Sequence, residues 1–263
     1  MDIRQRWQIE REHHDRVFKH KPLKQVFVPE KFYRTRPYGM RQLLDKIGPV
    51  RGLRVLDVGC GLGVFSLYFA FQGATVYAID ISREALLSFN GSHNLFKILA
   101  PAEFLPFKDC SVDVIYGAAV LHHLDIPLAA KEFYRVLRPG GQCFFYEPLG
   151  YNPVISLWRC LTPHRRTSTE RPLVLRDLEP LRKAFGAGDE NVVIEFYHLL
   201  ALLPQAVATT VGLMGLSGQR LYWRIQWLES ALAKVDHCLF QLLPVLRRYA
   251  QVIVINCTKP HRR

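Results

Sequence analysis

The chain has 263 residues, of which 49% are hydrophobic and 22% charged, and its formal net charge is +12. This length and hydrophobic content exclude a generally disordered chain and predict one large domain, or one domain with an elaboration. The six cysteines form no Cys-x-x-Cys pair and no Cys/His ligand spacing, so we expect reduced thiols and no metal site.

The positive charge is unevenly distributed along the chain. Residues 1–54, 131–183 and 247–263 have net charges of +8, +5 and +5, whereas residues 55–130 and 184–246 are net acidic. This pattern permits a nucleic acid, an anionic membrane surface or an acidic substrate as a partner. A basic surface without a specific partner explains it as well.

Residues 1–50 precede the first predicted strand and are polar and helical in places. We expect them to form an arm, or lid, over a ligand site. The first residues contain no apolar run, so a secretory signal or membrane anchor is not expected there, and the predicted location is the cytoplasm.

A buried strand followed by a glycine-rich turn is the most informative motif. Residues 54–58 are branched and apolar, Gly59, Gly61 and Gly63 follow, and helical spacing resumes over residues 64–71. Glycine permits positive φ and lets a ligand approach the backbone, while the free N–H groups of the next helix attract an anion. The motif predicts a cofactor site, although such a turn is sometimes only a tight turn.

Two acids narrow the choice of ligand. The glycine spacing differs from the dinucleotide fingerprint, because the third glycine, Gly63, comes only two places after Gly61 and Val64 stands where the pattern needs its last glycine. Asp80 ends the second predicted strand, where its carboxylate is placed to accept two ribose hydroxyls; the alternative is that it caps a helix starting near Ser82. Asp57 stands just before the glycines and would repel a pyrophosphate, so it favours a cationic or amino-bearing ligand.

Residues 53–149 resemble the class I S-adenosylmethionine-dependent methyltransferases. The matching features are the Asp-x-Gly-x-Gly-x-Gly loop, Asp80, and the segments 102–107, 113–124 and 135–141. The resemblance implies an α/β fold with a Rossmann-like, doubly wound sheet of about seven strands, mostly parallel with an antiparallel last strand. Residues 191–197 and 250–257 are the expected sixth and seventh strands.

The resemblance also implies S-adenosylmethionine as the cofactor and S-adenosylhomocysteine as the product. The residues expected to bind the cofactor are Asp57, Gly59, Gly61, Gly63, Asp80, Ile81, Ala102, Glu103 and Ala118. Many relatives have Asp where this chain has Pro101, so Glu103 is the expected substitute beside the adenine; a solvated loop acid is the alternative. Relatives with a Glu-x-x-x-His-Asp run use it near the cofactor, which predicts that Glu12, His14 and Asp15 lie there, unless they form a solvated helix face.

Two further segments bear on the chemistry. His122 and His123 follow the fourth strand, where an imidazole would accept a proton from the acceptor during methylation; we favour His123, and the alternative is that neither is catalytic. The segment after the fifth strand resembles the acceptor border of some small-molecule methyltransferases. It predicts an acceptor pocket formed by Glu147, Tyr151, Asn152, Arg159 and Arg166. Its arginines would hold an acidic acceptor or pair with Glu170 and Asp177.

The segment between the last two strands is unusually apolar. No formally charged side chain occurs between Phe196 and Gln219, but Pro204 and several glycines disfavour a membrane span. Apolar residues then recur at steps of four and three: Leu221, Ile225, Leu228, Leu232, Val235, Leu239, Leu242 and Leu246. We expect an inserted helical pair that serves as a lid, a homodimer face or a peripheral contact with an anionic membrane; packing over the sheet is the alternative.

The expected organisation is therefore an arm (1–50), a methyltransferase core (51–198 and 248–259) and an apolar insertion (199–247). The expected function is methyl transfer from S-adenosylmethionine to an oxygen or carbon of a small, hydrophobic acceptor. The alternatives are an RNA methyltransferase, which the basic segments suggest, and a catalytically silent methyltransferase-like partner. The chain has no amino-methylating motif and no recognisable RNA module, which argues against the first alternative. Its cofactor motifs are intact, which argues against the loss of cofactor binding in the second.

Overall fold

The computed structural model describes residues 2–19, 28–153, 156, 160, 167, 169–186, 190–213 and 218–261. In this part of the chain one sheet has the order β3-β2-β1-β4-β5-β7-β6. Its strands are β1 Arg54–Val58, β2 Thr75–Asp80, β3 Leu95–Leu99, β4 Val112–Ala118, β5 Leu137–Pro148, β6 Val192–Tyr197 and β7 Val252–Thr258. Strands β1 to β5 pair in parallel, and β7 pairs antiparallel with both β5 and β6. This confirms the predicted Rossmann-like sheet and its antiparallel last strand.

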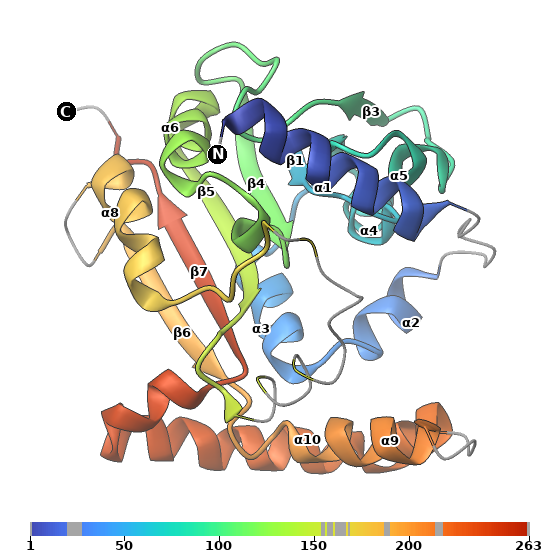
Figure 1. Ribbon diagram of the computed structural model, residues 1–263, viewed down its shortest axis with the longest axis vertical. Coiled ribbons are helices and arrows are strands. Elements are labelled where there is room, and N and C mark those ends of the chain that lie inside the picture. The colour runs from blue at the N-terminus through green and yellow to red at the C-terminus, as the bar shows by residue number, and fades with distance from the viewer. Residues whose placement is uncertain are drawn as a thin grey trace.

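Helices cover both faces of the sheet (Figure 1). The helices of the described residues are α1 Ile3–Phe18, α2 Pro29–Arg34, α3 Tyr38–Ile47, α4 Val64–Phe71, α5 Arg83–Leu87, α6 Ile126–Val136, α8 Glu179–Phe185, α9 Leu203–Leu213 and α10 Gly218–Leu242, with short 3-10 turns η1 Leu121–His123, η3 Leu175–Leu178 and η4 Pro244–Tyr249. Because side chains of a strand alternate between faces, Val55 packs with Phe69 of α4, whereas Leu56 packs with Phe133 of α6. The sheet is therefore apolar on both sides.

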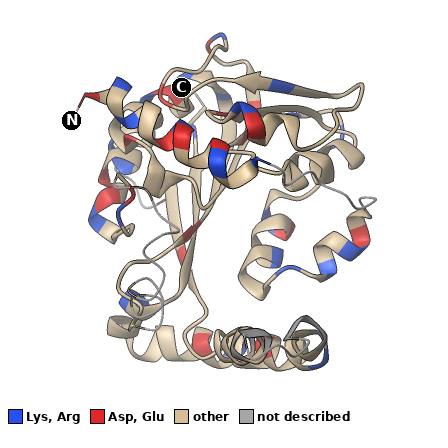
Figure 2. Ribbon diagram, turned by 45° about the vertical axis from the view of Figure 1, so that its right-hand side comes forward, with Lys and Arg blue, Asp and Glu red and all other residues tan. Residues whose placement is uncertain are grey.

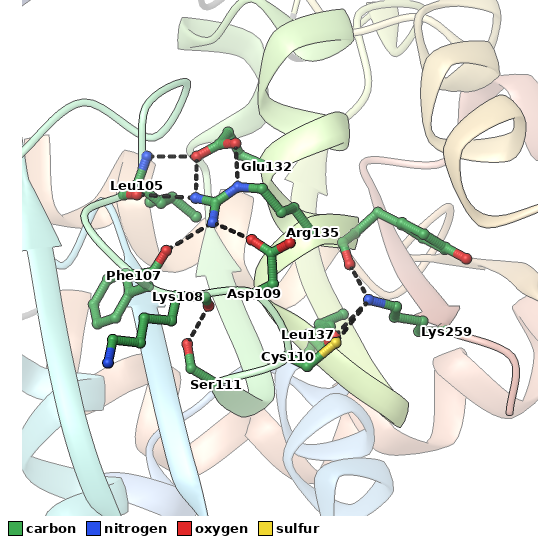
Figure 3. Close-up of polar contacts among 11 residues, drawn as sticks. Leu105, Phe107, Lys108, Asp109, Cys110, Ser111, Glu132, Arg135, Leu137 and Lys259 are labelled. Carbon is green, nitrogen blue, oxygen red and sulfur yellow. Dashed lines mark hydrogen bonds and ion pairs between the residues drawn. The ribbon is translucent and has the colours of Figure 1, made fainter. Parts of the chain in front are cut away.

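An arginine on α6 holds the loop that leads into β4 (Figure 3). The Arg135 guanidinium donates to the carbonyls of Leu105 and Phe107 at 3.0 and 2.7 Å, and it pairs with Glu132 and Asp109 at 2.7 and 2.9 Å. The planar fork of arginine satisfies several acceptors at once. The loop that follows residues 102 and 103 is thus fixed to the helix behind it.

The carboxyl end of α6 is closed by a lysine from the end of β7. Lys259 Nζ donates to the carbonyls of Tyr134 and Leu137, both at 2.7 Å, although the side chain is almost entirely buried (Figure 3). Carbonyls at the end of a helix lack partners within the helix and favour a cation. This contact ties the last strand to the helix between β4 and β5.

Helices α9 and α10 lie side by side along one edge of the molecule, beyond the end of β6 (Figure 1). The Asp236 carboxylate of α10 accepts the backbone N–H groups of residues 199–201 at 2.8–3.0 Å. Glu229 accepts the N–H of Tyr38, at the start of α3, at 2.8 Å. These two buried carboxylates fix the helical pair to the sheet and to α3.

The face of α10 that packs against the rest of the molecule is not the predicted apolar stripe. Its buried positions are Glu229, Ala233, Asp236 and Phe240, so Leu228, Val235 and Leu242 of the stripe face outward. None of the described helices is both long enough and apolar enough to cross a membrane. The predicted division into arm, core and insertion stays a prediction.

Steric crowding at Gly63 yields a prediction about stability. A Cβ there would lie 2.4 Å from the Phe89 ring, and its φ is +68°; at Gly52 the φ is +77°, but nothing lies within 4 Å. We expect Gly63→Ala to lower the free energy of unfolding by about 2 kcal/mol more than Gly52→Ala, which bears backbone strain alone. Denaturant unfolding of the two variants measures this, and equal losses would contradict it.

Candidate active site

A cavity of about 350 Å³ lies where the carboxyl ends of β1, β2 and β4 meet helix α1. This volume is that of a small-molecule site, and the end of parallel strands is where such sheets bind ligands. Helix α1 runs across this end of the sheet (Figure 1). The predicted site residues in its wall are Asp57, Gly59, Gly61, Asp80, Ile81, Ala102, Glu103, Ala118 and His123.

The three glycines of the loop have different roles. All three have positive φ, between +51° and +68°. A Cβ on Gly59 would lie 2.6 Å from Val120, so the absence of a side chain at Gly59 leaves room for the turn after β4. Gly61 faces the cavity, where an added Cβ would meet only Phe18, and it leaves the backbone open to a ligand. Gly63 does not line the cavity.

Asp80 lies at the end of β2 with its carboxylate beside the glycine loop. It accepts the N–H of Gly61 at 2.9 Å and that of Ser82 at 2.8 Å. Burial raises the pKa of Asp80, and these hydrogen bonds oppose the shift. The cap of α5 is Ser82, whose Oγ accepts the N–H of Ala85, so Asp80 does not cap that helix.

Asp57 is the buried acid at the base of the cavity. Its carboxylate accepts a short hydrogen bond, 2.5 Å, from the Ser66 hydroxyl. Burial raises its pKa to about 7, and the bond from Ser66 opposes this shift. A cationic amino group placed here would restore the charged form, which fits the amino acid end of S-adenosylmethionine.

The residues predicted to lie beside the adenine also line the cavity. Ala102 and Pro101 line the cavity beside Glu103, whose carboxylate is buried. Glu103 accepts the indole N–H of Trp7 at 3.2 Å and the N–H of Asp125 at 2.9 Å. Burial raises the pKa of Glu103. It is therefore no solvated loop acid, and it links α1 to this wall.

The two histidines occupy different places. Both carboxylate oxygens of the fully buried Glu147 have hydrogen-bond partners. One accepts the N–H groups of Val120 and Leu121 at 2.7 and 2.9 Å, and the other contacts His122 Nδ1 at 2.8 Å. His122 lies outside the cavity wall, whereas His123 is part of it. Glu147 thus fixes the η1 turn instead of lining this cavity.

His123 forms a carboxylate–imidazole pair with α1. Glu10 Oε2 lies 3.0 Å from His123 Nδ1 and 3.5 Å from His14 Nε2. Burial alone would raise the pKa of Glu10, but its hydrogen bonds with His123 and His14 hold it well below the usual range. Since a carboxylate only accepts, His123 Nδ1 donates and Nε2 carries the lone pair. Burial also lowers the pKa of His123, which keeps the ring neutral.

Glu10 is the residue that sequence reasoning missed. We expected Glu12 near the cofactor, but its side chain is exposed and bonds Gln8. The cavity side of α1 is instead formed by Trp7, Glu10, His14 and Phe18. Their spacing of three and four residues is that of one helix face, and it was the signal available in the sequence. Asp15 lies beside this face and accepts from the Ser82 hydroxyl at 2.6 Å.

The cluster around Glu10 has the donor types of a metal site. The ligand atoms of Glu10, His14 and His123 lie within 4.8 Å of one another, and those of His122, His123 and Glu170 do likewise. Glu10 also accepts from the Thr167 hydroxyl at 2.9 Å and from Thr169. The donors therefore satisfy one another by hydrogen bonds, and the expectation of no metal stays a prediction.

The structure does not assemble the predicted acceptor residues in this cavity. Tyr151 is exposed, and Asn152 donates to the carbonyl of Tyr249 at 2.7 Å. Arg159 and Arg166 lie outside the described residues. Nearby, Arg171 pairs with Asp177 at 2.9 Å, one of the two roles foreseen for these arginines.

The burial of Asp57 predicts a pH-dependent stability. With a folded pKa of about 7 and an ordinary value of 3.8, the ionised form is disfavoured by folding. The free energy of unfolding should therefore fall as pH rises from about 4 to about 7, by 1–4 kcal/mol relative to Asp57→Asn, which cannot ionise. Denaturant unfolding without ligand measures this difference, and a difference independent of pH would contradict it.

Comparison with known proteins finds a methyltransferase domain in the core of the chain. Residues 56–145 match the model of a family described as a methyltransferase domain. The malonyl-[acyl-carrier protein] O-methyltransferase of Pectobacterium atrosepticum is 41% identical over 156 residues, which cover 58% of this chain and 62% of that protein. The chain thus spans less than two thirds of the length of the relatives it matches.

Two solved structures share the fold. Phosphoethanolamine N-methyltransferase 2 of Haemonchus contortus, solved with phosphomonomethylethanolamine and S-adenosylhomocysteine, has a TM-score of 0.62 and 16% identity, covering 95% of this chain and 60% of its own. An S-adenosylmethionine-dependent methyltransferase of Mesorhizobium loti has a TM-score of 0.54 and 17% identity, covering 83% and 96%. The matched domain, the sheet order and the glycine loop between two acids together support a class I S-adenosylmethionine-dependent methyltransferase.

Proposed function

We propose that this protein transfers a methyl group from S-adenosylmethionine to an oxygen or carbon of a small, hydrophobic acceptor. One observation carries the proposal: Gly61, Asp80, Glu103 and His123 face one cavity under α1. The cofactor supplies a methyl group that its sulfonium already makes electrophilic. The protein has to align the acceptor, exclude water and accept a proton.

The residues of the cavity divide this work. Asp80 is placed to accept ribose hydroxyls, and Asp57 to pair with an amino group. Glu103 and Ala102 form the adenine wall. Helix α1 closes the cavity with Trp7 and other side chains, which excludes water from the reacting atoms.

His123 is the proposed proton acceptor. Glu10 accepts its Nδ1–H, so Nε2 would take the proton that the acceptor oxygen or carbon loses when it receives the methyl group. Glu10 acts as a positioning residue, because it fixes the tautomer and stabilises the imidazolium that results.

The nature of the acceptor is inferred from the walls and the relatives. The apolar residues Trp7, Phe65, Val120 and Leu124 line the same cavity as His123. The Pectobacterium relative is named an O-methyltransferase, which supports oxygen as an acceptor atom. Labelled cofactor incubated with lipid, quinone and small-metabolite extracts would identify the acceptor.

Cofactor binding is tested by Asp80→Asn. We expect calorimetric titration with S-adenosylhomocysteine to show binding, weakened at least about tenfold in the variant, because a charged hydrogen-bond acceptor is lost. The control is Asp109→Asn, whose side chain is 74% exposed and outside the cavity. If the wild-type protein does not bind millimolar S-adenosylhomocysteine, the proposed cofactor site is wrong. If the wild type and Asp80→Asn bind it with equal affinity, Asp80 is not part of that site.

The proton acceptor is tested by His123→Gln and Glu10→Gln once an acceptor is identified. We expect His123→Gln to lower kcat by about 10²–10⁴ while S-adenosylhomocysteine still binds. The Glu10 carboxylate raises the pKa of His123, so Glu10→Gln should move the acidic limb of kcat/KM to lower pH. An unchanged pH profile would contradict the positioning role.

A further inference from the structure

The outer face of α10 is apolar and exposed. It is formed by the neighbours Trp227 and Leu228 and then, at steps of three and four, by Ala231, Val235, Cys238 and Leu242. Trp227 is 68% exposed and Leu242 is 77% exposed, and Val245 of the following η4 turn is 60% exposed. Leu203 and Val207 of α9 add to the exposed apolar surface. Exposed apolar residues in such a continuous row mark a contact surface.

Charges on this helical unit are sorted by sign. Glu229 and Asp236, the acids of the described part of α9, α10 and η4, are each 2% exposed and bound to backbone N–H groups. The exposed charged side chains there are all basic: Arg224, Lys234, Arg247 and Arg248. In Figure 2 this helical pair is mostly tan, with few charged positions. The surface therefore combines apolar side chains with a purely positive charge.

We propose that this outer face, formed by α10 and η4 with the exposed residues of α9, binds the surface of an anionic membrane. A helix lying in the interface buries its apolar residues at the level of the acyl chains, while lysine and arginine meet anionic headgroups. Tryptophan favours the same depth. The contact is peripheral, consistent with the lack of a spanning helix among the described residues.

Two other occupants fit the surface less well. A second copy docked by a twofold axis would bring the same basic residues of both copies together, and no exposed acid of the described unit would neutralise them. A nucleic acid would pair with the basic residues, but phosphates offer nothing to Trp227, Leu242 and Val245. A lipid surface satisfies both properties at once.

The surface is joined to the catalytic domain by buried contacts. Glu229 holds the start of α3, and Arg41 of α3 donates to Ser230 at 2.9 Å. Docking would thus hold the whole domain at the membrane. This inference does not depend on methyl transfer, and its test needs neither cofactor nor acceptor.

Sedimentation of the full chain with vesicles tests the proposal. We expect binding to phosphatidylcholine vesicles that contain about 30% phosphatidylglycerol and little binding to pure phosphatidylcholine. Replacing Arg224 or Lys234 by Gln should weaken partition roughly fivefold for each residue. The double change Trp227→Ser and Leu242→Ser should weaken it at least tenfold. High salt should reduce wild-type binding.

The matched control is Leu87→Ser on α5, where the leucine is 58% exposed on a different part of the molecule. Leu87→Ser should bind vesicles like the wild type, and circular dichroism should show all variants folded. Absence of wild-type binding, or equal binding by the Leu87 and Trp227/Leu242 variants, would overturn the proposal. A dimer that the Trp227/Leu242 variant converts to a monomer, without any vesicle binding, would assign the face to self-association instead.

Discussion

The site depends on a carboxylate that water does not reach. Glu147, at the end of β5, binds two backbone N–H groups and one imidazole of the turn that follows β4. A buried charge of this kind is tolerated only where hydrogen bonds compensate its lost hydration. Those bonds fix the turn that carries His123, and His123 in turn is hydrogen-bonded to Glu10 of α1. The end of the central sheet and the first helix are thereby joined through one polar network.

The core of the fold was predictable because its signals are local. Short branched runs, each ending in a turn, identified β1, β2 and β4, and helical spacing after the glycines matched α4 residue for residue. The antiparallel β7 came from a family resemblance and the order of the strands was not predicted, since pairing between distant segments leaves no local trace. The strand ends Asp57 and Asp80 follow from the same patterns and do face the cavity.

The parts that were predicted poorly depend on contacts between distant segments. Glu147 was expected at the acceptor, but its partners are N–H groups that only the folded turn brings near. Glu12 was named near the cofactor, although the Glu-x-x-x-His-Asp run that ends in His14 and Asp15 begins at Glu10. On α10 the apolar stripe left open whether that face is a contact surface or packs over the sheet, and the need of residues 199–201 for a hydrogen-bond acceptor turned Asp236 inward. The hydrogen bonds that these backbone N–H groups need, and not the apolar periodicity, determine which face of α10 is buried.

Helix α1 is both a wall and a barrier. Its side chains line the cavity and are held by Glu103, His123 and Ser82, which belong to three different segments of the core. With the cofactor placed as proposed, against Asp80 and Gly61, release of the product past α1 would require several of these bonds to break together. Turnover would then be set by how often this helix lifts, and the same residues that prepare the reaction would limit how fast the protein starts the next one.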